Sequence, residues 1–399
     1  MKKTKLLAIF ILSSISTFAQ EWNIQHEEPG GNRLRSVSMV SENIGYSAGE
    51  NGKILKTTDG ETWTDISLST STYIFSIHFI DANTGYIAGS GGMLKKTIDG
   101  GLNWVDQQIQ TDKSLMCVSF LNQNLGFAVG RNGTILKTND GGANWVNLTN
   151  LSFDKHINDV HIIDSDIIYL ATDSSLGSDS LRKSTDGGQN WVSLQTNIDS
   201  PSPAVHFTDV DNGTIIGTLG RLSRTTDGGN NWQPQNSNTG WDLHSVSFID
   251  NNNGYVTGHL GTIRKTTDGG LNWEVESSGT NNILYSVQMI GNSVYAVGTQ
   301  SVVLKKVSEN LSINENSISN KILIYPTITS GKIEVSTSLP ETSSSIKIIN
   351  LHGKVVQSIN LNLAKSKTIT LNPTLQNGLY FFSIIINNSM VSKKIILKK

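Results

Sequence analysis

The sequence predicts an all-β chain in two parts, a seven-bladed β-propeller followed by a small immunoglobulin-like β-sandwich. Three observations support this prediction. The motif [TS]-x-D-G-G-x-N-W recurs between residues 57 and 273, with its aspartates 40, 41, 46, 41 and 41 residues apart. Short alternating apolar runs between turn residues fill each interval, and no helical periodicity is present. After residue 307 the repeat stops, and a second set of short alternating runs begins near residue 321.

Each repeat contains four predicted strands. In the second repeat these are residues 73–80, 85–88, 93–97 and 103–107, separated by turns rich in Gly, Asn and Asp. Four antiparallel strands in about 40 residues is typical of one propeller blade. The first strand of the pattern occurs seven times, near residues 35, 75, 116, 158, 203, 244 and 285. We therefore expect seven blades.

The ring is expected to close through its amino-terminal segment. The motif occurs six times, so one outer strand is missing from blade seven. Trp22 precedes Arg35 by 13 residues, and the motif tryptophans precede the next first strand by 12 or 13. Residues 21–26 are therefore predicted to pair with Val302 to Lys306. Such closure removes the free sheet edges through which chains associate, and we expect a monomer.

The aspartate and tryptophan of each motif are predicted to be structural, because a residue type present in every blade cannot mark one site. The Asp-Gly-Gly turn needs glycines at positive φ, the aspartate can accept hydrogen bonds from the turn amides, and the tryptophan covers the hairpin. The copy from Asp59 to Trp63 is one residue shorter, so its hairpin should differ. The predicted structural residues are Asp59, Asp99, Asp140, Asp186, Asp227, Asp268, Trp63, Trp104, Trp145, Trp191, Trp232 and Trp273.

These repeats resemble the Asp-box, or bacterial neuraminidase, repeat. The longer pattern from Gly254 to Trp273 resembles the photosystem II stability and assembly factor family of seven-bladed propellers. The resemblance covers about residues 21–307, and it implies a propeller that grips a partner protein in a chaperone-like way. A photosynthetic role is not expected to transfer, because the C-terminal tail indicates a different kind of organism and compartment.

The chain is predicted to begin with a secretory signal over residues 1–19. Three lysines precede an apolar run that ends in small residues before Ala19, and the run is too short for a spanning helix. We expect cleavage after Ala19, a propeller over residues 20–307, a linker over residues 308–320 and a sandwich over residues 321–399. No transmembrane span is expected in the mature chain.

The tail resembles the C-terminal sorting domain of type IX secretion in Bacteroidetes. The matching pieces include Ile324-Tyr325-Pro326, Gly378-Leu379-Tyr380 and the segment from Ser392 to Ile396. The tail departs from the family at Thr327-Ile328, where the family usually continues Asn-Pro. The resemblance implies that residues 321–399 engage the type IX secretion machinery. It further implies passage through the periplasm to the cell surface or the medium, with removal of the tail left open.

Charge is distributed unevenly along the chain. The tail carries ten lysines against two glutamates, whereas residues 20–319 carry 18 basic and 31 acidic residues, a net charge of −13. A propeller of this charge repels phosphate backbones, so nucleic-acid binding is not expected.

The candidate binding residues lie in the turns between second and third strands and in the links between blades, which share one face of a propeller. The candidates are Trp241, Arg131, Arg221, His259, Tyr73 and Glu50. Trp241 is the one tryptophan outside the repeat frame, and it either contacts a ligand or covers the apolar end of blade six. The ligand on this face is predicted to be a protein or a glycan of unknown identity.

No metal or cofactor is predicted. His78, His161 and His206 share one position in their first strands, and imidazoles facing a common axis could bind a metal. Serines and a glutamine at the same position of the other blades favour a polar row in the channel or between blades. The insertion from Thr172 to Ser180 contains two aspartates but no recognisable calcium-loop spacing, which favours a solvated loop.

The sequence favours a non-catalytic binding or assembly platform over an enzyme. Asp-box sialidases clamp a carboxylate with three arginines, and the arginine motif that precedes their first box is absent from this sequence. No nucleophile elbow, zinc-protease motif or phosphate-binding loop is present. The alternative is a glycan-active hydrolase that uses carboxylates such as Glu50 or Asp242.

Overall fold

The computed structural model describes residues 21–149, 155–173, 180–198, 200–201, 203–307, 322–325, 328–337, 342–350, 355–363, 366–386 and 389–399. The chain divides into two compact units, Met1–Ser308 and Glu309–Lys399. The predicted signal, the predicted linker and most of the insertion in blade four lie outside the described residues.

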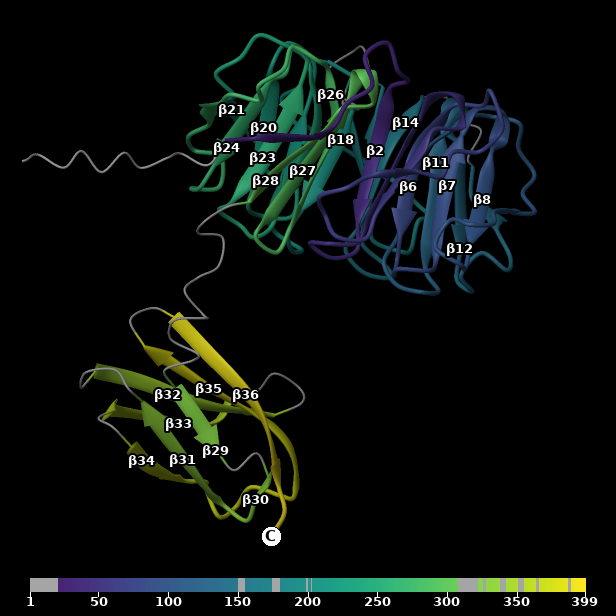
Figure 1. Cartoon of the computed structure of the whole chain (residues 1–399). Helices are drawn as coiled ribbons and strands as arrows, with labels where there is room; N and C mark the ends of the chain where they lie inside the picture. The colour runs from purple at the N-terminus through teal and green to yellow at the C-terminus, as the bar shows by residue number, and fades with distance from the viewer. Residues whose placement is uncertain are drawn as a thin grey trace, which may run out of the picture. The chain divides into compact units, whose positions relative to one another are not determined.

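The first unit is a propeller of seven four-stranded antiparallel sheets, which confirms the predicted fold class (Figure 1). Blade one contains β2 (Leu34–Met39), β3 (Gly45–Gly49), β4 (Ile54–Thr57) and β5 (Thr64–Asp65). Blade two contains β6 (Ile74–Phe79), β7 (Gly85–Gly89), β8 (Leu94–Thr97) and β9 (Val105–Asp106). Blade three contains β10 (Leu115–Phe120), β11 (Gly126–Gly130), β12 (Ile135–Thr138) and β13 (Val146–Asn147). Blade four contains β14 (Ile157–Ile162), β15 (Ile168–Thr172), β16 (Leu181–Ser184) and β17 (Val192–Leu194).

The remaining three blades repeat this order. Blade five contains β18 (Ala204–Phe207), β19 (Gly213–Ile216), β20 (Arg221–Thr225) and β21 (Gln233–Asn236). Blade six contains β22 (Leu243–Phe248), β23 (Gly254–Gly258), β24 (Ile263–Thr266) and β25 (Glu274–Glu276). Blade seven contains β26 (Leu284–Ile290), β27 (Ser293–Gly298), β28 (Val303–Val307) and, from the other end of the propeller, β1 (Asn23–His26).

The amino-terminal strand closes the ring. β1 pairs antiparallel with β28, with Asn23 opposite Lys305 and Ile24 opposite Leu304. Trp22, which is 6% exposed, packs edge-on against Tyr255 of blade six at 5.8 Å. Trp63 of blade one packs on Tyr295 of blade seven in the same way. Trp22 therefore occupies the place of a motif tryptophan, as its spacing predicts.

The Asp-box turn is held by its own aspartate. In blade two, Asp99 accepts hydrogen bonds from the Asn103 amide N–H at 2.9 Å and from the Asn103 side chain at 2.8 Å. These bonds hold the pKa of Asp99 at about 2. The two glycines of the turn take φ values of +72° and +87°. In the shorter first box, Thr62 replaces the asparagine as the donor to Asp59, and only Gly60 has a positive φ.

The boxes also join neighbouring blades. In blades one to four, a lysine near the end of the third strand reaches the box of the next blade, as Lys137 does when it donates to the Gly187 carbonyl at 2.8 Å. A tyrosine hydroxyl of the second strand does the same, since Tyr86 donates to the Gly141 carbonyl at 2.7 Å. Further bonds of this kind are made by Lys56, Lys96, Lys183 and Tyr169. The structural role predicted for the repeat thus includes holding blade against blade.

A ring of polar side chains joins the innermost strands. Ser38 accepts a hydrogen bond from the backbone N–H of Phe79 in the next first strand at 2.9 Å. His161 accepts from Phe207 at 3.3 Å, Gln288 from Met39 at 2.6 Å and Ser247 from Met289 at 3.1 Å. His78 and His206, at the same position, interact with the backbone of Phe120 and Phe248. The histidines weighed above as metal ligands are therefore part of the contact between blades.

The second unit is a β-sandwich. Its strands are β29 (Ile322–Tyr325), β30 (Ile328–Thr329), β31 (Lys332–Thr337), β32 (Thr342–Asn350), β33 (Val355–Leu363), β34 (Ser366–Thr370), β35 (Gly378–Ile386) and β36 (Ser389–Leu397). They form a sheet in the order β29-β31-β34 and a sheet in the order β30-β36-β35-β32-β33, and both contribute to one apolar core. The two-residue strand β30, parallel to β36, adds to the seven predicted strands.

Within the described ranges, no helix has the length and apolar character needed to cross a membrane.

Candidate functional site: the turn face of the propeller

One face of the propeller carries the turns between second and third strands, and we call it the turn face. Several of these turns are 3₁₀ turns, namely η1 (Glu50–Gly52), η2 (Ser90–Gly92), η3 (Arg131–Gly133) and η4 (Thr299–Ser301). The first strand of each blade begins beside its turn, as the pairing of Leu34 with Gly49 shows. A Cβ on Gly49 would lie 1.8 Å from the Arg33 carbonyl oxygen, so this close approach requires glycine.

A β-bulge at the start of the first strand sets the side chains at the channel mouth. The register shifts between the first and third residues of six first strands, so the second residue is left outside the ladder. These second residues are Arg35, Phe75, Met116, Asn158, His244 and Tyr285. They differ from blade to blade, unlike the box residues, and therefore give this end of the channel its local chemistry.

Arg35, Tyr285 and Glu50 form the centre of a charged and aromatic cluster across blades one and seven. The Arg35 guanidinium lies 4.2 Å from the centre of the Tyr285 ring, a cation–π geometry. It donates to Glu50 at 3.1 Å, and Arg33 lies 3.5 Å from the same carboxylate oxygen. The side chain of Glu50 is 16% exposed. Glu50 is thus held by two arginines at the channel mouth.

The cluster continues into blade six. The ring of His244 lies 5.1 Å from Tyr285 and 4.7 Å from His259. His259 lies 3.9 Å from the Asp242 carboxylate, which also accepts the Leu219 amide N–H at 2.8 Å. Burial, with the nearby His259, lowers the pKa of His244 to about 4, so this imidazole is neutral at ordinary pH. We refer to Arg35, Glu50, Tyr285, His244, His259 and Asp242 as the mouth cluster.

The structure brings two of the six predicted binding residues into the mouth cluster, Glu50 and His259. Tyr73 stands apart in the link before blade two, where it is 43% exposed and stacks on Phe75 at 6.4 Å. Arg131 lies in the turn of blade three, and Arg221 begins β20 of blade five. Trp241 lines a groove described next.

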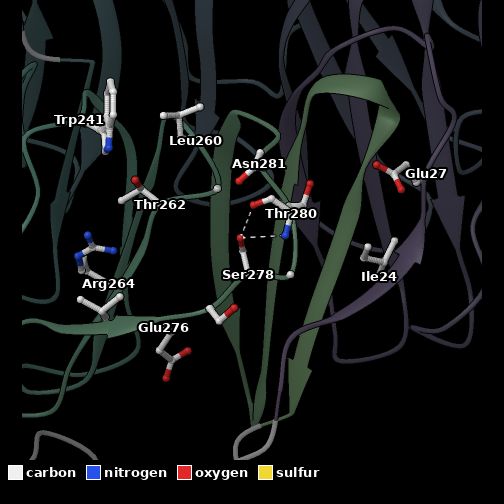
Figure 2. A pocket seen from close by; sticks show the side chains of 14 residues that line it. Ile24, Glu27, Trp241, Leu260, Thr262, Arg264, Glu276, Ser278, Thr280 and Asn281 are labelled. Atoms are coloured by element: carbon white, nitrogen blue, oxygen red, sulfur yellow. Dashed lines mark hydrogen bonds between the residues drawn. The ribbon is translucent and has the colours of Figure 1, made fainter.

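A groove of about 660 Å³ lies between blades six and seven, next to the turn face (Figure 2). One wall comes from blade six and carries Trp241, Thr262 and Arg264, and the other is β1 with Ile24. The blade link from Ser277 to Asn281 lies between these walls. Trp241 is 52% exposed, so it does not cover the apolar end of blade six.

Two exposed leucines stand on either side of the link that carries Trp241. Leu219 and Leu260 have φ values of +57° and +50°, a left-handed conformation that is strained for leucine. In the corresponding turns of blades one, two, three and seven this conformation belongs to Asn51, Gly91, Asn132 and Gln300. Blades five and six therefore present apolar side chains where the other described turns are polar.

Sequence reasoning missed Arg35, Tyr285 and His244 as members of a site. All three were visible as the opening residues of first strands, but alternation alone does not give the direction of a side chain at a bulge. A comparison of the second residue of each first strand from blade to blade could have identified them, because this residue varies while the box residues do not.

The fold is that of a seven-bladed propeller built from Asp-box repeats and followed by a separate β-sandwich. A model of the photosynthesis system II assembly factor YCF48 family matches residues 56–191 and 230–328, more than half of the chain, and the protein therefore belongs to this family. A model of the secretion system C-terminal sorting domain matches residues 323–398. The expected resemblances are thus confirmed for both parts. A type IX sorting domain implies secretion or attachment at the cell surface.

Solved structures with the same fold share little sequence with this chain. A structure described as YCF48 bound to D1 peptide is 19% identical, with a TM-score of 0.62 over 72% of this chain and 97% of that chain. YCF48 from Cyanidioschyzon merolae is 21% identical, with a TM-score of 0.62 over 73% of this chain and 100% of that chain. The WD40 propeller of Doa1 is 12% identical, with a TM-score of 0.60 over 73% and 98%. These likenesses show the fold alone, and no curated protein matches the sequence.

Proposed function

We propose that this protein is a non-catalytic binding and assembly platform that works outside the cell or at its surface and holds a partner polypeptide on its turn face. The observation that carries the proposal is the mouth cluster. It joins three blades through a cation–π contact, tilted ring contacts and ion pairs, and its residues differ from the repeat consensus. Arginine and tyrosine are the residue types that most often dominate protein interfaces.

A polypeptide ligand is supported by the family and by the fold. A similar solved propeller is described as bound to a peptide, which supports a ligand of this class for the present chain. Arg131 in the turn η3, Arg221 at the start of β20 and Tyr73 in the link before blade two are proposed to extend the contact. The domain limits proposed with this function are residues 1–19, 20–307, 308–320 and 321–399.

The alternative hydrolase is less well supported by the geometry. A glycoside hydrolase needs one carboxyl group to donate a proton and a second to act as base or nucleophile. Glu50 is engaged by Arg35 and Arg33, and Asp242 accepts a backbone N–H and lies beside His259. Both carboxylates are thus already engaged by neighbouring groups of the propeller, which suits a binding surface better than a pair of catalytic carboxyl groups.

The double variant Arg35→Gln/Tyr285→Leu tests the platform. Tagged mature protein is used to capture partners from the surface and medium of the cells that produce it. We expect a partner captured by the unaltered protein to be lost with the double variant and kept with Val146→Ala, a change on the exposed outer strand β13. Equal capture by all three proteins would contradict the proposal, and so would turnover of aryl-glycosides by the unaltered protein.

We also propose that residues 321–399 direct export through the type IX machinery. Deleting this segment should leave the propeller in the periplasm, because the matched sorting domain is removed while the predicted signal remains. Cell fractionation and blotting measure the distribution. Release of the truncated protein into the medium at the level of the full chain would contradict this role, whereas a folded propeller in the periplasm would support it.

A further inference from the structure

We propose that the groove between blades six and seven is a binding site for a neutral oligosaccharide, with Trp241 as the surface on which a sugar ring stacks. The groove lies next to the turn face and shares no residue with the mouth cluster. Disruption of the polypeptide site should therefore leave the sugar site intact, and the two proposals can be tested separately. A groove of about 660 Å³ lies within the range typical of small-molecule sites.

Trp241 offers an aromatic surface that the fold does not use. Its side chain is 52% exposed, and its ring N–H has no hydrogen-bond partner in the described part of the protein. Figure 2 shows Trp241, Thr262 and Arg264 following one another along the blade-six wall. An exposed indole presents a flat apolar face and one donor, which suits the C–H face and the hydroxyl groups of a pyranose.

Polar groups lie along the same groove. Thr262 lines it and is 5% exposed, and Asn281 adds a side-chain amide from the blade link. Arg264 donates to the Ile263 and Asn238 carbonyls, but its buried Nε has no partner. A buried polar group without a partner is unfavourable, so a ligand hydroxyl group that pairs with this Nε would bind favourably.

The charge of the groove favours an uncharged sugar. Arg264 is the one cation among its lining residues, and Glu27 and Glu276 are both acidic. Glu276 is already engaged, since it accepts from the Trp22 indole at 2.8 Å and pairs with Lys306 at 2.6 Å. The segment from residue 20 to 319 has 31 acidic residues against 18 basic ones, which disfavours an anionic polymer.

The lining also distinguishes a sugar from a peptide. Amphipathic peptides that dock in grooves lay an apolar face on an apolar floor. Here the blade link that lies between the walls presents hydroxyl and amide groups from Ser277, Ser278, Thr280 and Asn281. The apolar contribution is limited to Trp241 and to the aliphatic side chains of Ile24, Leu260 and Val275.

Leu260 supplies a second sign of function at this groove. It lines the groove in the left-handed conformation that the equivalent turns share, while 51% exposed. An exposed leucine at a position that favours asparagine or glycine is strained, and such strain is often found at binding surfaces. Leu260→Asn is expected to raise the melting temperature by a few degrees, because asparagine tolerates this conformation. The same change should weaken sugar binding.

The test is affinity electrophoresis of the mature chain in native gels that contain xylan, starch, β-glucan, galactan or mannan. Alginate, which is anionic, serves as the charge comparison. We expect at least one neutral polysaccharide to retard the protein. Trp241→Ala should weaken the retardation about tenfold or more, since loss of one stacking contact of about 1.4 kcal/mol corresponds to this factor. Trp241→Tyr should preserve most of it.

Two further variants separate binding from folding. Thr262→Val removes a hydroxyl that lines the groove and should leave the fold intact while weakening retardation. Leu102→Ala, on the exposed box hairpin of blade two, should change nothing. The proposal is overturned if no neutral polysaccharide retards the protein, if Trp241→Ala migrates as the unaltered chain does, or if alginate is preferred. The Arg35→Gln/Tyr285→Leu variant should retain full sugar binding.

Discussion

Lowering the pH from about 6.5 to about 4 is expected to remove much of the propeller's stability before its carboxylates are protonated. His78, His161 and His206 lie between first strands, where partial burial lowers the pKa of the first two to about 4 and of the third to about 3. His161 uses a ring nitrogen to accept the Phe207 N–H at 3.3 Å, and protonation removes that acceptor. Protonation of any of the three places a charge between the first strands.

The direction of the effect follows from where the protons bind. In the unfolded chain these histidines take up protons near pH 6.5, whereas in the folded chain they stay neutral down to about pH 4. The unfolded state therefore gains protons first, and the free energy of unfolding falls as the pH falls through this window. The loss is about 3 kcal/mol for each histidine by pH 4, an upper figure because the interior relaxes. His206 lies 5.0 Å from His161 and near Arg224, and both groups lower its pKa further. The contribution of His206 to the loss of stability is therefore larger.

Other titrating groups act in a different window or with the opposite sign. The box aspartates have lowered pKa values, so their contribution is lost only below about pH 3.8. Burial raises the pKa of Asp159, which accepts a hydrogen bond from Cys117. Protonation of Asp159 in the folded chain therefore increases the free energy of unfolding as the pH falls. The net fall between pH 6.5 and pH 4 therefore reports the histidines, reduced by Asp159.

Urea unfolding at half-unit pH steps measures this dependence, and His161→Gln/His206→Gln is the matched variant. Gln288 shows that glutamine can fill this position, because it accepts the Met39 N–H at 2.6 Å. The double variant should lose about half of the pH dependence while remaining folded at pH 7, because His78 and His244 keep their lowered pKa values. A stability curve for the unaltered protein that is flat from pH 6.5 to pH 4 would contradict the assigned neutral state.

The number of blades and the closing strand could be predicted because both depend on spacing. Trp22 stands at the interval of a motif tryptophan before Arg35, and the structure places it accordingly against Tyr255. The lysines that precede the motif in several repeats can be recognised in the sequence. Their hydrogen bonds to the next blade depend on how the blades pack and cannot be predicted from spacing. Lys137 and Gly187, for example, are 50 residues apart in sequence.

The mouth cluster could be predicted only in part. Glu50 and His259 lie in turns that a propeller topology places on one face, so their selection followed from the strand assignment. Arg35, Tyr285 and His244 needed the bulges, which arise from the register between first and second strands. The groove likewise depends on Ile24, brought beside blade six by closure of the ring. The strand β30 is too short for alternation to reveal it.

Removing residues 20–26 is expected to prevent the propeller from remaining a stable monomer. The deletion takes away the outer strand of blade seven and exposes the edge of β28 from Val303 to Val307. An unpaired edge of this kind is a template for association with another chain. Size-exclusion chromatography of the truncated mature chain should show aggregates or higher oligomers, whereas the full mature chain should elute as a monomer.

Trp22→Ala isolates the side-chain part of this closure. Trp22 is 6% exposed, packs on Tyr255 and donates to Glu276 at 2.8 Å. Its truncation leaves a cavity between blades six and seven, and such changes cost about 3–5 kcal/mol. Because whole domains are stable by only about 5–15 kcal/mol, denaturant unfolding should shift clearly. Asn23→Ala, on an exposed position of the same strand, should stay within about 0.5 kcal/mol of the unaltered protein.

The two results together decide what holds the ring closed. If Trp22→Ala unfolds within about 1 kcal/mol of the unaltered chain while the deletion aggregates, the ladder between β1 and β28 carries the closure and the indole does not. If both variants remain monomeric and stable, blades one and six must be held in place without blade seven's outer strand. That outcome would also remove Ile24 as a wall of the groove, because a strand that is dispensable to the fold cannot fix a binding surface.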